Sequence, residues 1–547
     1  MPTTPPVQTP GRTPTFDESG LEQLGDRINQ QGRRRGSRRK RRTAWVLGSV
    51  AVLLLVVVGG AFGYTWYLNN EIHRIDVKGL TAAETTGDLA GTENILLVGS
   101  TDRCALKVQN AAYGLCSQGV NGVNSDVVMI LHLDPNTGKV AILSIPRDLF
   151  VPNARVDGAN KIDAGLYNGP SQLVASIKEN LGISIQHYVV LNFDTFANVV
   201  DALGGVNMYF PEPVFDQYSG LVQRTTGCVH LDGIRALQVV RARHLQYQPP
   251  GNTNPYPENW PFENQSDIAR IRRDHEFLRV LASAVGKQGL SNPVTDQQLI
   301  SSVAPQLQVD NKLSIGDMVN LVLAFHAVNP QKAPQLTLPV EVDQFGSYLY
   351  KGGYYGDIEF PVNTLDRKVI DQFLNLPGND NTLTGHALPS PAQVTVSVLN
   401  GSGTAGQAGT TSSQLQALGF HVTGVGDATP VGAEAETVVY FSHKTAADEA
   451  AAQEVARSMS GAVITAYGPT TNGAQVTVVT GTQFTVNAPA RAASSTTTPA
   501  PAGASGSSGG STTTTTSSSL FQAPTVAVSP LQPWDPRACT PSGGEGH

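Results

Sequence analysis

The sequence predicts an α/β protein with a mixed central sheet, helices on both faces of that sheet, one N-terminal transmembrane helix and a small second α/β domain. Three observations lead to this prediction. Apolar runs of strand length alternate with helical patterns from residue 92 to about residue 330, and short strands and loops complete a first domain over residues 92–385. The same alternation recurs over residues 393–485, and residues 44–68 form one uncharged apolar run. A chain of 547 residues also exceeds one ordinary domain.

The chain begins with a basic arm, residues 1–43, which we expect to be disordered. Its first 42 residues hold ten Lys or Arg against four Asp or Glu, whereas the remaining residues hold 27 against 40. Because positive charge is confined to this arm and to local clusters, we do not expect a nucleic-acid-binding protein.

Residues 44–68 are predicted to span a membrane. The run is long enough to cross a hydrocarbon core of about 30 Å, and Trp45 and Trp66 lie near its ends. Its length, and the long arm before it, favour an uncleaved anchor over a signal peptide. Since positive charge stays inside, we expect a single-pass cell-membrane protein with a cytoplasmic N-terminus and with everything from Asn69 outside. Residues 69–91 are predicted to be a linker.

The four cysteines suit an oxidising compartment. Cys104 and Cys116 bracket a short loop rich in Gly, Asn and Gln, which predicts a local disulfide. The pairing of Cys228 and Cys539 is left open.

Three predicted strands, residues 94–98, 127–133 and 140–145, place polar side chains together. If consecutive strands are antiparallel, the end of the first, the start of the second and the end of the third share one edge of the sheet. These places hold two carboxylates and an arginine–aspartate pair: Asp102, Asp126, Arg147 and Asp148. Such a set suits a hard divalent cation, although each aspartate taken alone is more often a turn or cap residue.

Further helices are predicted over residues 171–181, 194–203 and 233–241, with strands at 188–192 and 206–210. The apolar faces of these helices predict either an ordinary core or a space for a long-chain lipid between helices and sheet. The sequence leaves both alternatives open.

Two arginine pairs follow. Arg241 and Arg243 lie two apart and point the same way in extended chain, whereas Arg270 and Arg273 share a face if Ser266 caps a helix. Arginine suits phosphate because its planar donors are paired and its charge is permanent. The alternative is a solvated helix face with salt bridges to neighbouring acidic residues, namely Asp267, Asp274 and Glu276.

After a linker at residues 386–392, the second domain is predicted to contain strands at 394–399, 420–425, 436–441 and 475–479 and helices at 405–418 and 446–459. Its Asn400–Gly403 turn lacks the lysine of a phosphate loop, so we interpret the domain as a binding or positioning module. Residues 486–547 are rich in Ser, Thr, Ala, Pro and Gly and are predicted to be a disordered tail, near whose end lies the motif Pro533–Pro536.

Several motifs resemble the LytR-CpsA-Psr family in their order along residues 92–285. They are Asp126 at the head of an apolar strand, Ser144–Asp148, Lys161–Ala164, Val200–Val206, Leu231–Gly233, Arg241–Arg243 and Asp267–Arg273. The second domain is similar to the LytR C-terminal domain. The family consists of membrane-anchored enzymes with an external catalytic domain, as predicted for this chain.

The resemblance implies an enzyme, a phosphotransferase that moves a glycopolymer from a polyprenyl-pyrophosphate carrier to peptidoglycan. It implies Mg²⁺ (or Mn²⁺) held by Asp102 and Asp126, which would be catalytic together with Arg147, Arg241 and Arg243. The pyrophosphate would be bound by basic side chains, namely Arg147, Lys161, Arg241, Arg243, Arg270 and Arg273. Asp148 or a metal-side carboxylate could accept the proton of the attacking hydroxyl.

The chain departs from the family pattern at Asn124, where an arginine is usual, at Ala269 and Asp274, and in an insertion over residues 246–265. Two alternatives to the transferase are a non-catalytic receptor or regulator that binds polyprenyl phosphates or wall glycans, and a lipid pyrophosphatase. Low Lys, high Ala and Gly and the Ser/Thr/Pro-rich tail are typical of a high-GC Gram-positive organism, for which arabinogalactan would be the expected glycopolymer.

Overall fold

A computed structural model describes residues 72–104, 106, 115–119, 122–264, 266–287, 307–314, 316–318, 333–343, 348–432, 434–487 and 531–539. The predicted arm, the predicted span at residues 44–68 and most of the predicted tail lie outside these ranges. Among the helices within them, none combines the length and the apolar character that a membrane span requires.

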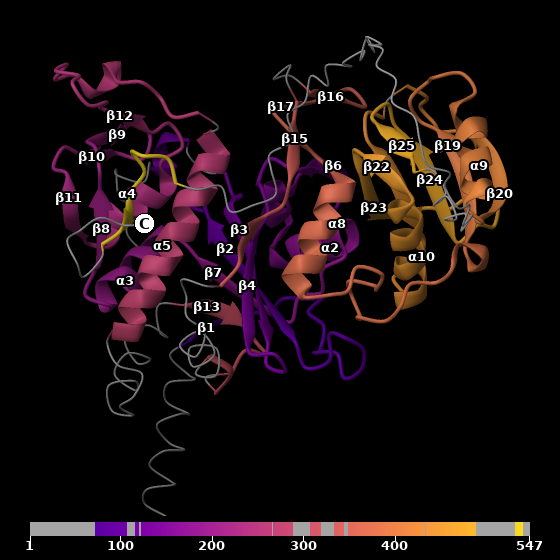
Figure 1. Ribbon diagram of the computed structural model, residues 1–547, viewed down its shortest axis with the longest axis horizontal. Helices are drawn as coiled ribbons and strands as arrows, with labels where there is room; N and C mark the ends of the chain where they lie inside the picture. The colour runs from indigo at the N-terminus through magenta and orange to yellow at the C-terminus, as the bar shows by residue number, and fades with distance from the viewer. Residues whose placement is uncertain are drawn as a thin grey trace, which may run out of the picture. The chain divides into compact units, whose positions relative to one another are not determined.

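A seven-stranded sheet forms the centre of the first domain, in the order β1-β13-β7-β2-β3-β4-β14 (Figure 1). β2 is antiparallel to β3, and β3 to β4, whereas β7 is parallel to β2 and β14 to β4. The predicted mixed sheet is therefore confirmed. Its strands are β1 (His73–Ile75), β2 (Glu93–Ser100), β3 (Ser125–Asp134), β4 (Lys139–Ser144), β7 (His187–Leu191), β13 (Gln308–Asp310) and β14 (Gln335–Thr337). β1 lies within the segment predicted to be a linker, so that part of the prediction was wrong.

Both faces of the sheet are covered by helices. Successive strand residues point to opposite faces, so Leu96 packs in one core and Ile95 in another. The first core includes side chains of α2 (Pro170–Leu181) and α8 (Asn363–Leu374), and the second is covered by Leu278 of α5 (Ser266–Lys287). Figure 1 shows α5 on one side of the sheet and α2 and α8 on the other, as predicted.

A further core joins α3 (Phe193–Ala202), α4 (Gly233–Arg241), β8 (Val206–Phe210) and β11 (Gly227–Leu231) to α5. A Cβ at Gly233 would lie 2.1 Å from the carbonyl oxygen of Ala197, so only glycine allows α4 to begin this close to α3. The Asp201 carboxylate accepts a hydrogen bond of 2.7 Å from the Gly233 N–H. This contact fixes α4, whose last residue is Arg241.

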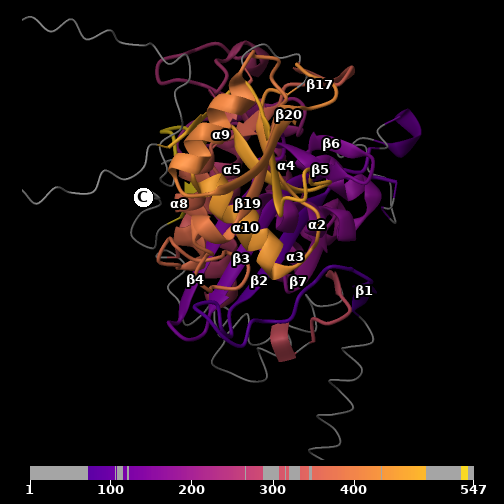
Figure 2. The ribbon, with the colours of Figure 1, turned by 90° about the vertical axis from the view of Figure 1, so that its right-hand side faces the viewer.

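The second domain contains a five-stranded sheet in the order β20-β19-β24-β21-β23, with α9 and α10 packed in its core (Figure 2). The elements are β19 (Thr395–Asn400), α9 (Gln407–Ala417), β20 (His421–Asp427), β21 (Thr437–Phe441), α10 (Ala446–Arg457), β23 (Val463–Tyr467) and β24 (Val476–Thr480). All except β23 were predicted, with bounds that differ by no more than a few residues.

Short strands complete the described chain. They are β5 (Phe150–Arg155), β6 (Gly158–Lys161), β9 (Val214–Asp216), β10 (Leu221–Gln223), β12 (Gln246–Tyr247), β15 (Val340–Val342), β16 (Tyr348–Tyr350), β17 (Gly353–Gly356), β18 (Glu359–Pro361), β22 (Met459–Gly461), β25 (Phe484–Val486) and β26 (Arg537–Ala538).

The cysteines form two pairs at disulfide distance. The sulfur atoms of Cys104 and Cys116 are 1.96 Å apart, as the sequence predicted. Those of Cys228 and Cys539, whose pairing the sequence left open, are 2.32 Å apart. Residues 531–539 are ordered and add β26 to the edge of β8, so the prediction of a disordered tail was wrong for this part.

Candidate functional site

The predicted edge of the sheet gathers polar side chains from the ends of β2, β3 and β4. Ser100 of β2 lies opposite Ser125 of β3, and beyond them the Thr101 N–H donates to the Asn124 carbonyl over 3.0 Å. Asp102 and Asp126 therefore flank the same end of two adjacent strands. The Cys104 N–H donates to the Asp102 carboxylate over 3.1 Å, which fixes that side chain.

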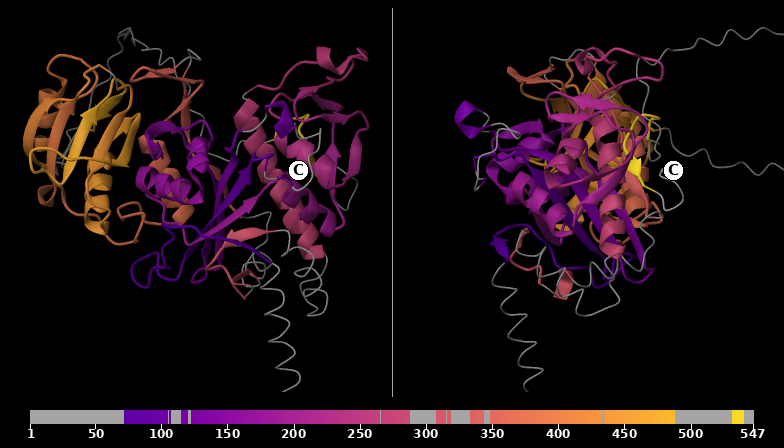
Figure 3. Two further views of the ribbon diagram at one scale, coloured as in Figure 1. Left: turned by 180° about the vertical axis from the view of Figure 1, so that it is seen from behind. Right: turned by 90° about the vertical axis from the view of Figure 1, so that its left-hand side faces the viewer.

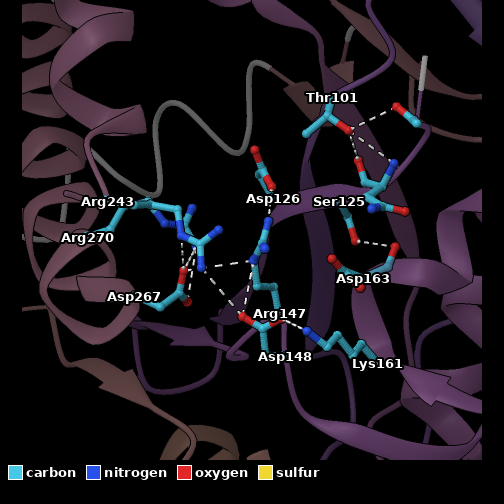
Figure 4. Close-up of polar contacts among 12 residues, drawn as sticks. Thr101, Ser125, Asp126, Arg147, Asp148, Lys161, Asp163, Arg243, Asp267 and Arg270 are labelled. Carbon is cyan, nitrogen blue, oxygen red and sulfur yellow. Dashed lines mark hydrogen bonds and ion pairs between the residues drawn. The ribbon is translucent and has the colours of Figure 1, made fainter. Parts of the chain in front are cut away.

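Arg147, just after β4, links three carboxylates. Its guanidinium donates to Asp126 and lies 3.3 Å from the Asp148 carboxylate and 3.9 Å from that of Asp267 (Figure 4). Burial alone would lower the pKa of Arg147, but the surrounding carboxylates raise it above its ordinary value. Its charge is therefore fixed, and it ties the sheet edge to α5.

Asp148 is a second carboxylate shared by several cations of this cluster. The Lys161 ammonium lies 2.7 Å from its carboxylate and the Arg243 guanidinium 3.7 Å from it. Burial would raise the pKa of Asp148, but Arg147, Lys161 and Arg243 together hold the pKa below its usual value. A carboxylate stabilised in this way is a poor proton acceptor, so the structure favours an anchoring role for Asp148 over the role of base.

Asp267, in the first turn of α5, is a site residue that the sequence indicated only as a salt-bridge partner of the arginines. Its carboxylate lies 3.1 Å from both Arg243 and Arg270. Because the carboxylate contacts arginines from two segments distant in sequence, it sets their spacing. The spacing of Asp267 and Arg270 along one helix face could have indicated this contact.

A pocket with a cavity volume of about 130 Å³ opens beside this cluster. Asp126, Arg241, Arg243 and Arg270 lie in its wall. The Arg241 guanidinium also sits 4.4 Å from the centre of the Phe193 ring. The rest of the lining is mainly apolar and comes from β2, β3, β7, α3, α4 and α5. It includes Leu97, Val127, Met129, Leu191, Phe196, Leu237, Val240, Phe277 and Leu278.

The predicted convergence of Asp126 and Arg241 is thus present in the structure, and Arg243 and Arg270 join them. Arg147 and Lys161 do not line the pocket but bind the carboxylates beside it. Of the two alternatives for the apolar helix faces, an ordinary core or a space for a long-chain lipid, a pocket between the helices and the sheet fits the second.

Arg273, expected among the pyrophosphate-binding side chains as a supporting contact, does not share the pocket with Arg270. Its side chain has 0% exposure, pairs with Glu263 and lies 3.3 Å from the Asp535 carboxylate. It also donates to the carbonyl oxygen of Ala242. Arg273 therefore supports the backbone between Arg241 and Arg243 from behind.

Two further side chains lie near the site without having been predicted as functional. The Arg103 guanidinium is 5.2 Å from the Phe193 ring centre and is attracted by the charge of Asp126. It also donates a hydrogen bond of 3.2 Å to the Thr101 carbonyl oxygen, so a further cation lies at this edge of the sheet. Asp163 is buried beside Arg147, and burial raises the pKa of its carboxyl to about 7.

Asp274 lies in the pocket wall one turn after Arg270. Its carboxylate is 3.6 Å from the Arg270 guanidinium, and neither of its oxygens has a hydrogen-bond partner within the described part of the chain. Burial raises the pKa of Asp274 to about 7, and the two arginines Arg270 and Arg273 only partly oppose this shift. Near neutral pH this carboxyl group of the pocket wall is therefore only partly ionised.

A divalent cation would have two protein carboxylates available, those of Asp102 and Asp126. Among the described residues, no three or more His, Cys, Asp or Glu side chains are grouped to hold a metal ion. Since Asp126 keeps 28% of its side chain exposed, the donor set suits an oxygen-preferring ion that takes its other ligands from phosphate and water.

Comparison with known proteins agrees with this geometry. Residues 69–357 match the model of the LytR_cpsA_psr family, and residues 393–484 match the family described as LytR cell envelope-related transcriptional attenuator.

Curated relatives include the probable cell wall biosynthesis protein LcpB of Corynebacterium glutamicum, which is 33% identical over 51% of this chain and 62% of its own length. The polyisoprenyl-teichoic acid–peptidoglycan teichoic acid transferase TagU of Bacillus cereus is 27% identical over 37% of this chain and 62% of its own length. The chain thus spans less than two thirds of each. Among solved structures, a LytR-Csp2A-Psr enzyme from Actinomyces oris is 26% identical with a TM-score of 0.39, over 49% of this chain and 87% of that one.

The elevated pKa of Asp274 predicts that replacing it by Asn stabilises the protein at alkaline pH. The folded state keeps the proton up to about pH 7, whereas the ordinary value is 3.8, so wild-type stability falls as pH rises between these values. Asp274→Asn does not titrate. We expect its Tm to match that of wild type near pH 4 and to exceed it at pH 8, by an amount corresponding to about 1–4 kcal/mol.

Differential scanning calorimetry at both pH values measures this difference. Asp157→Asn, the same substitution at a carboxylate with 73% side-chain exposure, is the control and should change the Tm little. A wild type that gained stability over Asp274→Asn as pH rises would contradict the prediction.

Proposed function

Because the chain belongs to the LytR-CpsA-Psr family, we propose that it transfers a glycopolymer from a polyprenyl-pyrophosphate carrier to peptidoglycan. One observation carries the proposal: an apolar pocket at the predicted edge of the sheet has three arginines and two aspartates in its wall. An isoprenoid diphosphate has the same division into an apolar chain and an anionic head. The similarity to TagU, named as a polyisoprenyl-teichoic acid–peptidoglycan teichoic acid transferase, supports the same reaction class.

In this proposal the isoprenoid chain lies along Val127, Met129 and Leu278, and the diphosphate meets Arg241, Arg243 and Arg270. Arginine binds phosphate through paired charge-assisted hydrogen bonds. Arg147 and Lys161 do not contact the ligand in this proposal. They bind carboxylates beside the pocket and so contribute to the electrostatic potential at the pocket mouth.

The reaction is a displacement at the phosphorus on the glycan side. A hydroxyl oxygen of peptidoglycan forms the new phosphodiester bond, the bridging P–O bond breaks, polyprenyl phosphate leaves, and the hydroxyl proton is lost to water. Such transfer depends mainly on positioning and on charge neutralisation, and the arginines supply both. Mg²⁺, which Asp102 and Asp126 would hold, adds positive charge for the leaving phosphate when bound.

The module at residues 393–485 is proposed to bind or position a wall component. The arabinogalactan-like cargo stays a prediction from composition.

Replacing Arg241 by Ala should lower kcat/KM for Mg²⁺-dependent release of polyprenyl phosphate by about 100-fold or more, since an arginine aimed at developing charge contributes on the order of 3 kcal/mol. Arg241→Lys should fall in between, because it keeps the charge but loses the paired donors. Arg155→Ala, which removes an arginine outside the pocket, is the matched control. The assay is release of lipid phosphate from a lipid-linked glycan, with peptidoglycan present or absent and with a chelator in one arm.

The assay conditions distinguish the transferase from the two alternative functions. Release without peptidoglycan would favour the pyrophosphatase, and binding without release under any condition would favour the receptor. Full activity of Arg241→Ala, or of wild type in chelator, would refute the assigned roles.

Filling the apolar wall should discriminate between substrates by chain length. Val127→Trp should raise KM for a long polyprenyl substrate about tenfold, roughly 1.4 kcal/mol, and leave KM for a short isoprenoid analogue unchanged. Val222→Trp, the same change at an exposed strand position outside the pocket, is the control. An equal effect on both chain lengths would show that the lipid does not lie along Val127.

We also propose that residues 44–68 anchor the chain in the cell membrane, with residues 1–43 in the cytoplasm and the catalytic domain outside. The basic residues before this apolar run support that orientation. External protease on intact cells should digest a tag at the C-terminus and spare one at the N-terminus. The reverse pattern would contradict the orientation.

A further inference from the structure

The ordered segment at residues 531–539, here called the C-terminal clip, returns to the catalytic domain from the far end of the chain. It lies beside α5, as the yellow segment in Figures 1 and 3 shows. Arg537 and Ala538 pair with β8, and Cys539 lies at disulfide distance from Cys228. The Trp534 ring stacks on Tyr247, with centroids 4.0 Å apart.

Asp535 is the charged centre of the clip and has 0% exposure. Its carboxylate accepts hydrogen bonds of 2.6 Å and 3.0 Å from the Arg272 guanidinium and lies 3.3 Å from Arg273. Arg272 and Arg273 are both buried in α5, so removal of Asp535 would leave buried positive charge poorly compensated. The clip therefore completes a charge cluster that the rest of the domain leaves incomplete.

This charge cluster contacts the backbone that carries the arginines of the proposed phosphate site. Arg273 donates to the carbonyl oxygen of Ala242, the residue between Arg241 and Arg243. Glu263, near the end of the insertion over residues 246–265, is the second carboxylate that pairs with Arg273. Tyr247, near the start of the same insertion, stacks on Trp534. The clip thus contacts the insertion near its start and shares Arg273 with a residue near its end.

We propose that Asp535 is a positioning residue: through Arg273 and the Ala242 carbonyl, the C-terminal clip holds Arg241 and Arg243 in the geometry that binds diphosphate. The proposal rests on the proposed function only in naming diphosphate as the ligand. It assigns a role to the Pro533–Pro536 motif, whose docking the sequence could not specify. Asp535 itself, buried behind Arg273, does not reach the ligand.

The first test measures affinity of the full-length chain for inorganic pyrophosphate by calorimetry, together with kcat and KM for transfer. Asp535→Asn should weaken pyrophosphate binding about tenfold and lower kcat, since displacements near 1 Å in a binding site cost factors of this order or more. Asp157→Asn should leave affinity, kcat and KM unchanged. Unchanged affinity in Asp535→Asn would overturn the proposal.

The second test asks whether an added clip peptide restores pyrophosphate binding. A misfolded variant would not recover binding in this way. A protease site is introduced between residues 505 and 519 of a chain that carries both Cys228→Ser and Cys539→Ser, so that cleavage frees the clip. Cleavage should weaken pyrophosphate binding, and a synthetic peptide of residues 531–539 should restore it with saturation. A peptide with Asp535→Asn should not restore it.

In the matched chain with both cysteines intact, cleavage should have little effect because the disulfide retains the clip. Peptide binding without recovery of pyrophosphate affinity would overturn the proposal. A chain that binds pyrophosphate in this clip-dependent way but never transfers glycan would refute the proposed function and support the inference.

Discussion

Shared carboxylates are the constraint on which the site depends. Arg147, Arg243 and Arg270 all approach Asp267, and Arg147, Lys161 and Arg243 all approach Asp148. Like charges this close in a half-buried setting repel by several kcal/mol unless anions lie between them. Each of these carboxylates contacts several cations, and burial raises the pKa of Asp274 to about 7, so that this group is only partly ionised near neutral pH. Positive charge therefore remains in excess at the pocket mouth. That excess suits a ligand carrying two phosphates.

α5 connects this charge to the apolar part of the pocket. Within about three turns it supplies Asp267 and Arg270 to the site, Asp274 and Phe277 to the pocket wall, and Arg273 to the support behind Ala242. The opposite wall comes from α3 and α4, which approach closely because Gly233 lacks a side chain. α5 therefore fixes the position of the charged residues relative to the apolar part of the pocket. The C-terminal clip stabilises the buried arginines of α5.

Much of the site followed from local patterns. Antiparallel strands at residues 94–98, 127–133 and 140–145 required Asp102, Asp126 and Arg147 to share an edge, and the structure has that edge. The separation of Arg273 from the pocket that Arg270 lines has a physical reason. A spacing of three places two side chains on neighbouring parts of a helix, but only packing decides which of them meets solvent and which meets a buried carboxylate. Here Glu263 and Asp535 occupy one side and the pocket the other.

By itself the sequence determined the alternation of strands and helices, the mixed sheet, the Cys104–Cys116 pair and the residue types suited to phosphate, because periodicity and side-chain chemistry are local properties. Only the tertiary structure decided that the helices leave a pocket, that Asp267 joins three arginines, and that Asp535 meets Arg273 from 262 positions away in the chain. These contacts depend on which buried charges find partners when distant segments pack, and no local pattern encodes that choice.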